Sequence, residues 1–201
     1  MLAREAVVLA SGSMTRRRML QAAGIAVTVD PAAIDEDEIK RSLRAGGGNA
    51  AECATALAET KALRVSTRHK NLLVLGADQI LECDGAFFDK PKDRASAAAQ
   101  LAALAGRRHH LVSAAAVARN GAVIWRHVDR AELSMRPLSE RFISRYIEAG
   151  GEDLLQTVGA YRLEGLGAQL FERTEGDFFT ILGLPLLPLL AFLRDQGLLP
   201  Q

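Results

Sequence analysis

The sequence predicts an α/β fold from three observations. Apolar runs at residues 6–10 and 71–75 are long enough for buried strands and too short for most helices. Segments with helix-capping residues and glycine stops lie between such runs. The length of 201 residues suits one domain, or one domain with two lobes, and buries a core without disulfides or a structural metal. Since no linker or repeat divides the chain, we predict a single domain over residues 1–201.

Charge and cysteine content exclude several classes of protein. Lys and Arg number 25 against 24 Asp and Glu, so no global basic field favours nucleic acid or an anionic membrane. The apolar runs are too short to cross a bilayer, and the N-terminus lacks the pattern of a signal peptide. Cys53 and Cys83 are too few for a disulfide framework and have no metal-site spacing. We predict a cytoplasmic protein with no nucleic-acid and no membrane partner.

The first strand, at residues 6–10, leads through a turn of small residues into a helix that begins near Met14. A Ser/Gly turn at a helix N-terminus offers free backbone N–H groups to an anion. Arginines in the first turn oppose the helix dipole, a cost that a bound anion would explain. The alternative is a solvated basic face, which we favour for the neighbouring arginines. We interpret Ser11, Ser13 and Arg16 together as a phosphate site.

A second strand at residues 26–29 is followed by an acidic run at residues 34–38 and then a short helix. Acidic residues are favoured at a helix N-terminus without any function, although their carboxylates also suit a divalent cation. Asn49 is a predicted cap for a helix over residues 50–66. Lys61 lies on that helix, where a lysine taken alone indicates only a solvent-facing position.

The apolar run at residues 71–75 is followed directly by Gly76 and Asp78. We expect the strand to end there, which would place the carboxylate at the rim of the sheet, where α/β proteins bind ligands. The alternative is that Asp78 only caps a turn, as Asp often does after a strand. This segment alone does not separate the two interpretations.

The middle of the chain predicts two hairpins and a helix. Asp84 and Gly85 connect short strands at residues 80–83 and 86–88, and Asp93 caps a helix over residues 94–105. Asn120 and Gly121 form a second hairpin turn, between strands that end near residue 117 and begin at residue 123. The adjacent His109 and His110 face opposite sides of a strand, so we interpret them as structural or exposed residues rather than metal ligands.

The C-terminal third predicts a helix from Ser139 to residue 148 and another from Pro185 to about residue 196. Between them, residues 159–167 are rich in glycine, which lets a backbone approach a ligand closely. Their spacing is not that of a dinucleotide-binding fingerprint. The chain also lacks a Walker motif and a nucleophile elbow.

Several short motifs, each weak alone, form an ordered set that is specific. They are residues 9–13, the helix with Arg16, residues 76–78, residues 90–91, residues 159–161 and residues 183–185. In this order and spacing the chain resembles the Maf family from about residue 7 to residue 193. The resemblance implies a long mixed sheet with flanking helices in two lobes around a central cleft, as in inosine-triphosphate pyrophosphatases. It also implies hydrolysis of a nucleoside triphosphate to the monophosphate and pyrophosphate, a divalent metal cofactor (Mg²⁺ or Mn²⁺), and a homodimer.

The resemblance assigns roles to particular residues. Asp78 matches the proposed catalytic acidic residue, and Glu36 matches a second carboxylate of the active site, so both are candidate metal ligands. The candidate substrate-binding residues are the serines of the small-residue turn and three basic residues: Ser11, Ser13, Arg16, Lys61 and Lys90. Whether Asp78 is a general base or only a metal ligand stays open, because a metal can itself generate the hydroxide.

Base choice is expected at Thr15, Gln79 and Glu164. Met14 and Thr15 depart from the usual family residues, but Gln79 and Glu164 resemble the branch acting on 7-methyl-GTP. A carboxylate only accepts hydrogen bonds, and guanine presents two adjacent donors where uracil and thymine present one. Glu164 therefore favours a guanine-type base over UTP and dTTP, unless its side chain points into solvent.

Two other functions remain compatible with the residues. One is a nucleotide-binding regulator of cell division without turnover, and the other is a different phosphate-ester hydrolase on a similar fold. Release of pyrophosphate distinguishes the predicted enzyme from both, because a phosphatase would release orthophosphate and a regulator would release nothing.

Overall fold

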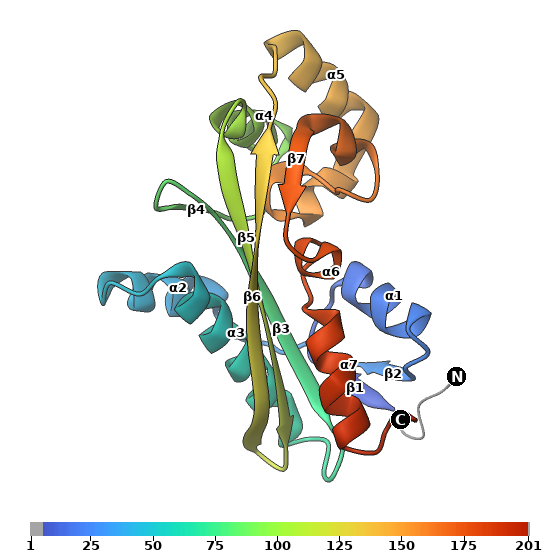
Figure 1. The fold of residues 1–201 in the computed structure, drawn as a ribbon. Coiled ribbons are helices and arrows are strands. Elements are labelled where there is room, and N and C mark those ends of the chain that lie inside the picture. Colours follow the sequence, from blue (N-terminus) through green and yellow to red (C-terminus); the bar gives the residue numbers. More distant parts are fainter. Residues whose placement is uncertain (1–5, 201) are drawn as a thin grey trace. The chain divides into compact units, whose positions relative to one another are not determined.

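In a computed structural model, residues 6–200 form a mixed α/β fold with a central sheet flanked by helices, which confirms the predicted fold class (Figure 1). The chain divides into two units. Unit 1 contains the residues up to Gln79, Ser113–Asp129 and the residues from Gly183 onward. Unit 2 contains Ile80–Val112 and Arg130–Leu182.

The sheet has the strand order β2-β1-β3-β5-β6-β7, with β4 paired to β3. β1 is parallel to β2 and β3, whereas the pairs β3–β4 and β6–β7 are antiparallel, so the sheet is mixed. The strands are β1 (Val7–Leu9), β2 (Val27–Val29), β3 (Val74–Cys83), β4 (Ala86–Phe88), β5 (Arg108–Arg119), β6 (Ala122–Met135) and β7 (Phe171–Glu175).

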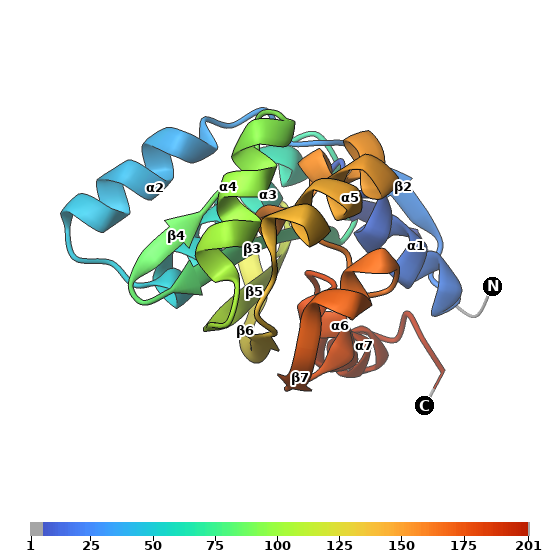
Figure 2. The same cartoon turned by 90° about the horizontal axis from the view of Figure 1, so that it is seen from above.

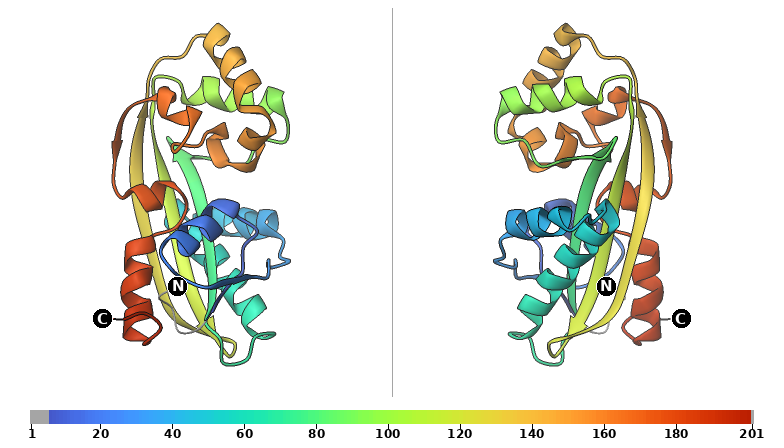
Figure 3. Two further views of the ribbon diagram at one scale, coloured as in Figure 1. Left: turned by 90° about the vertical axis from the view of Figure 1, so that its right-hand side faces the viewer. Right: turned by 90° about the vertical axis from the view of Figure 1, so that its left-hand side faces the viewer.

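Unit 1 contains α1 (Met14–Ala22), α2 (Glu36–Ala45), α3 (Ala50–Ser66) and α7 (Leu186–Asp195). The side views place α3 on one side of the unit 1 strands and α1 and α7 on the other (Figure 3). Local chemistry explains where α3 begins, because Asn49 and Glu52 form a capping box that satisfies backbone N–H groups at its start. The predicted helix over residues 50–66 is therefore confirmed.

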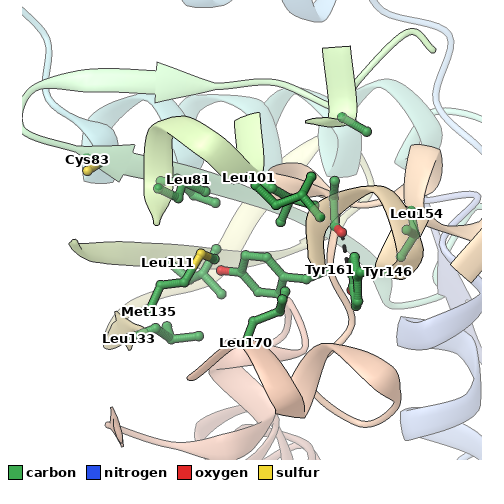
Figure 4. Close-up of a cluster of buried hydrophobic side chains, with 14 of the residues drawn as sticks. Leu81, Cys83, Leu101, Leu111, Leu133, Met135, Tyr146, Leu154, Tyr161 and Leu170 are labelled. Carbon is green, nitrogen blue, oxygen red and sulfur yellow. Dashed lines mark hydrogen bonds between the residues drawn. The ribbon is translucent and has the colours of Figure 1, made fainter. Parts of the chain in front are cut away.

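Unit 2 contains α4 (Arg94–Leu104), α5 (Glu140–Gly150) and α6 (Phe178–Ile181), with 3-10 turns at Gly151–Gln156, Val158–Ala160 and Leu166–Leu170. Helices α4 and α5 lie side by side (Figure 2). The core of this unit gathers leucines from β3, α4, β5 and β6 around Tyr146 and Tyr161 (Figure 4). Burial of these side chains is the main force that holds the unit together.

His109 is a fully buried polar residue of that core. Its Nε2 lies 2.8 Å from the hydroxyl of Tyr161, and the rings of Tyr161 and Phe171 pack against it. Nδ1 has no hydrogen-bond partner among the described residues. Burial lowers the pKa of His109 to about 4, so the ring is neutral at pH 7. The structural interpretation of this histidine is confirmed.

Strand β3 corrects the predicted position of Asp78. The strand begins at Val74 and continues without interruption to Cys83, so Asp78 lies in its middle and not at the rim of the sheet. Asn71 has a φ of 64°, in the left-handed region, and lies outside the strand. The strand accommodates Asp78 and Gln79 because each has a polar partner. Lys61 bonds to Asp78 on one face, and Ser113 bonds to Gln79 on the other. A position inside a strand also excludes the turn-cap alternative for Asp78.

Most other predicted elements are confirmed within a few residues of their ends. Both hairpins form, and Asn120 and Gly121 have positive φ angles of 51° and 79°, as their turn requires. Strand β7 and the short helix α6 were not predicted. The residues of β7 are mostly exposed and charged, so they carry no alternation of apolar and polar side chains.

Candidate active site

The side chain of Arg16 connects three segments of unit 1. Its Nε donates to the carbonyl oxygen of Gly183 at 2.7 Å, and Nη1 donates to the carbonyl of Ala77 at 2.8 Å and to Ser11 Oγ at 3.1 Å. At the backbone, Arg16 N donates to Ser13 Oγ, so Ser13 is the N-cap of α1. Arg16 thereby holds together the turn before α1, strand β3 and the segment before α7.

These contacts limit how Arg16 can bind a phosphate. Nη2 is the nitrogen that makes no hydrogen bond to a described residue. The guanidinium can therefore donate to a phosphate through Nη2, but it cannot form a bidentate contact that also uses Nε or Nη1. Burial lowers the pKa of Arg16, and the negative charges of Asp78 and Glu36 oppose that shift. An arginine remains protonated under such conditions, so Arg16 supplies a buried positive charge.

Lys61, Asp78 and Glu36 meet on the face of β3 that packs against α3. Lys61 Nζ lies 2.5 Å from Asp78 Oδ1 and 2.8 Å from Glu36 Oε1. Lys61 and Asp78 are each 6% exposed, whereas the side chain of Glu36 is 44% exposed. The expectation that Lys61 faces solvent when taken alone is wrong, because its ammonium is buried between two carboxylates.

Gly76 explains why Lys61 reaches Asp78. A Cβ atom on Gly76 would lie 2.1 Å from the carbonyl oxygen of Ala58 and 2.6 Å from the amide of Ala62, both in the backbone of α3. Alternate residues of a strand share a face, so Gly76 and Asp78 both face α3. The missing side chain lets the helix approach the strand closely, and Lys61 then lies beside Asp78.

The acidic run at residues 34–38 contains both a helix cap and a carboxylate of the site. Asp35 is the N-cap of α2, with its side chain accepting from Glu38 N at 2.9 Å, as expected for acidic residues that only start a helix. Glu36, one residue later, directs its carboxylate to Lys61. Within this run, therefore, one residue serves the helix and another enters the site.

Thr15 is half-buried in the first turn of α1. Gln79 is adjacent to Asp78 in β3, so its side chain lies on the opposite face of the strand. Its Nε2 donates to Ser113 Oγ at 3.0 Å, and its Oε1 lies 3.6 Å from the position of a Cβ on Gly183. Ser113 is fully buried and was not predicted to take part. A single hydroxyl within the otherwise apolar stretch of β5 was the signal that could have identified it.

Two candidate residues belong to unit 2. Lys90 is exposed between β4 and α4, and Glu164 is exposed in the turn before the 3-10 segment Leu166–Leu170. The candidate site within unit 1, here called the Lys61 site, consists of Ser11, Arg16, Glu36, Lys61 and Asp78. The roles of Lys90 and Glu164 in substrate binding stay predictions.

Comparison with known proteins identifies the family. The family model described as "Maf-like protein" matches residues 6–196. A relative from Paramagnetospirillum magneticum, named a nucleoside triphosphate pyrophosphatase, is 55% identical over 94% of this chain and 98% of its own length. A relative from Rhizobium meliloti, named a 7-methyl-GTP pyrophosphatase, is 49% identical over 95% of this chain and 96% of its own. The chain therefore belongs to the Maf family.

Solved structures show a weaker likeness. A nucleoside-triphosphatase / dITP/XTP pyrophosphatase from Mycobacterium abscessus has a TM-score of 0.41 and 18% identity, covering 67% of this chain and 76% of its own. Among the described residues, no helix combines the length and apolar character needed to cross a membrane.

Proposed function

We propose that this protein is a nucleoside triphosphate pyrophosphatase, which hydrolyses the bond between the α- and β-phosphates and releases a nucleoside monophosphate and pyrophosphate. The observation that carries the proposal is the Lys61 site, where two buried cations and two carboxylates converge on one strand. The names of the relatives support the same reaction. They also make a regulator without turnover the weaker alternative.

The residues of the site suit this reaction. Lys61 has a third N–H with no partner among the described residues, and Arg16 has Nη2, so each can donate to a phosphate oxygen. Asp78 holds Lys61 through Oδ1, and its Oδ2 makes no hydrogen bond to a described residue. We propose that Oδ2 orients the attacking water or accepts its proton, while the water oxygen bonds to the α-phosphorus and the bond to the bridging oxygen breaks.

A divalent metal is part of the proposal. Among the described residues no group of three or more His, Cys, Asp or Glu side chains could hold a metal alone. Magnesium in nucleotide enzymes binds one or two carboxylates and completes its shell with phosphates and water, so Glu36 and Asp78 fit such a site. When bound, the metal would neutralise charge on the leaving pyrophosphate or lower the pKa of a bound water.

The proposed substrate has a guanine-type base, with 7-methyl-GTP the leading candidate. The acceptor-only carboxylate of Glu164 matches the two donors of guanine, and N7 methylation adds positive charge that a carboxylate favours. The name of the Rhizobium meliloti relative supports this choice. A dTTP/UTP pyrophosphatase is the alternative. A homodimer and a cytoplasmic location also stay predictions.

Pyrophosphate release from a panel of 7-methyl-GTP, GTP, UTP and dTTP tests the function. We expect activity with Mg²⁺ or Mn²⁺, none with excess chelator, and recovery when metal is restored. Full activity in chelator would exclude the metal, orthophosphate as the product would indicate a phosphatase, and tight binding without product would indicate a regulator.

The same panel with Glu164→Gln tests the base assignment. An amide can offer a donor to a carbonyl of uracil or thymine, so we expect the ratio of kcat/KM for 7-methyl-GTP over UTP to fall at least tenfold. An unchanged ranking would show that Glu164 does not read the base. A wild-type preference for UTP or dTTP would remove the assignment to the 7-methyl-GTP branch.

A further inference from the structure

The ammonium group of Lys61 occupies the position between Glu36 and Asp78 where a shared cation would lie. Nζ is 2.8 Å from Glu36 Oε1 and 2.5 Å from Asp78 Oδ1. A magnesium ion that bound these same two oxygens would lie about 2.0–2.1 Å from each. Nζ already holds one oxygen of each carboxylate, so a metal that takes these same two oxygens competes with the ammonium for them.

The charges of the Lys61 site already balance. Glu36 and Asp78 contribute two negative charges, and Lys61 and Arg16 contribute two positive charges. A divalent cation that arrived alone would add two positive charges beside the Lys61 ammonium, which is 6% exposed, although Glu36 at 44% exposed keeps contact with solvent. Like charges at short range in a buried site repel strongly, because little water screens them.

A nucleoside triphosphate makes the net charge of the site more negative. Its phosphates bring several negative charges, which a metal, Lys61 and Arg16 together can offset. The side chain of Lys61 has four rotatable bonds, so Nζ can move from the carboxylates to phosphate oxygens while α3 stays in place. Gly76 and the capping box at Asn49 fix the helix itself.

From this geometry we infer that Lys61 competes with a divalent metal for Glu36 and Asp78, so that the metal binds together with the nucleotide and not before it. Lys61 is then both a phosphate ligand and a barrier to binding of the metal alone. This inference rests on the proposed function for the identity of the ligand. Metal and nucleotide binding should be positively coupled, and the coupling should depend on Lys61.

Titration of Mn²⁺ into nucleotide-free protein, followed by electron paramagnetic resonance, tests the barrier directly. Lys61→Met removes the charge and keeps most of the side-chain length. We expect Lys61→Met to bind Mn²⁺ at least tenfold more tightly than wild type. Lys70→Met is the matched control, because Lys70 is exposed beyond the end of α3 and its loss should leave Mn²⁺ affinity unchanged. Equal or weaker Mn²⁺ binding by folded Lys61→Met would overturn the inference.

A second measurement uses only wild-type protein, in case Lys61→Met does not fold. In protein labelled with ¹³C-lysine, the Cε resonance of Lys61 reports the surroundings of Nζ. We expect it to stay unchanged when millimolar Mg²⁺ is added alone, and to shift when Mg²⁺ is added with α,β-methylene GTP. A shift with Mg²⁺ alone would show that the metal displaces the lysine without a nucleotide, contrary to the inference.

The two proposals can fail separately. The Mn²⁺ titration requires no turnover. Tighter Mn²⁺ binding by Lys61→Met, in combination with no pyrophosphate release by the wild-type protein, would remove the proposed function and keep the barrier. Pyrophosphate release by the wild-type protein, in combination with an unchanged Mn²⁺ affinity in Lys61→Met, would keep the function and remove the barrier.

Discussion

Asp78 divides its carboxylate between two tasks. Oδ1 lies 2.5 Å from Lys61 Nζ, which leaves Oδ2 for the reaction. We predict that Asp78→Asn lowers kcat by about 10²–10⁴-fold, as loss of a positioned acid–base group typically does, in protein that remains folded. Steady-state pyrophosphate release measures the effect. Asp195→Asn, at the exposed end of α7, should keep the wild-type rate. A folded Asp78→Asn protein with near-normal turnover would remove Asp78 from the chemistry.

At the scale of residues, the identities of the site were predictable and their partners were not. The resemblance named Arg16, Lys61 and Asp78. It could not show that Arg16 uses most of its N–H donors to bond to Gly183, Ala77 and Ser11, since Gly183 lies 167 positions after Arg16 in the chain. The partners of a long polar side chain depend on tertiary packing, which local sequence does not contain.

At the scale of elements, the close packing of α3 on β3 is the feature on which the site depends. Gly76→Ala would place a methyl group against the backbone of Ala58, which can yield only if the helix moves. We predict a loss of about 1–3 kcal/mol in the free energy of unfolding, as overpacking usually costs. We also expect kcat to fall, because displacement of α3 moves Lys61 out of reach of the phosphates.

Chemical unfolding and pyrophosphate release measure these two effects of Gly76→Ala. Gly46→Ala is the control, since its Cβ would lie 3.4 Å from the nearest atom, the carbonyl of Leu43, at an ordinary φ of −84°. Wild-type stability and turnover in Gly76→Ala would show that the helix contact does not set the geometry of the site.

Elements with local signals were predictable from the sequence, and the length of β3 was not. Asn49 and Asp93 cap helices through bonds to residues two or three positions away, so their signals lie within a short window. In β3, Gly76 and Asp78 resemble the end of a strand. Only the presence of α3 and its lysine makes them suitable for the middle of one.

At the scale of the whole molecule, buried His109 links stability to pH. Its pKa is about 4 in the folded protein against 6.5 for an ordinary histidine, because burial disfavours the charged ring. The unfolded chain therefore binds a proton first as pH falls. Full stability is present above pH 6.5 and is lost progressively down to pH 4. At pH 5 this histidine should cost about 2 kcal/mol of the free energy of unfolding.

Comparison of wild type with His109→Gln checks this prediction, since an amide can bond to the Tyr161 hydroxyl without titrating. Urea unfolding at pH 7.5 and pH 5.0 gives the loss for each protein. We expect the loss to be smaller in His109→Gln by about 2 kcal/mol. Equal losses in the two proteins would mean that His109 is already protonated in the folded state or stays neutral when unfolded.

Three of the four boundaries between the two units fall inside strands. They lie between Gln79 and Ile80 in β3, between Val112 and Ser113 in β5, and between Asp129 and Arg130 in β6, whereas the fourth, between Leu182 and Gly183, lies between α6 and α7. Neither unit is a continuous piece of chain, so no pair of cuts in the gene could excise one or graft it onto another protein. Removal of either unit would cut β3, β5 and β6, so we expect deletion mapping of the activity to yield only inactive fragments.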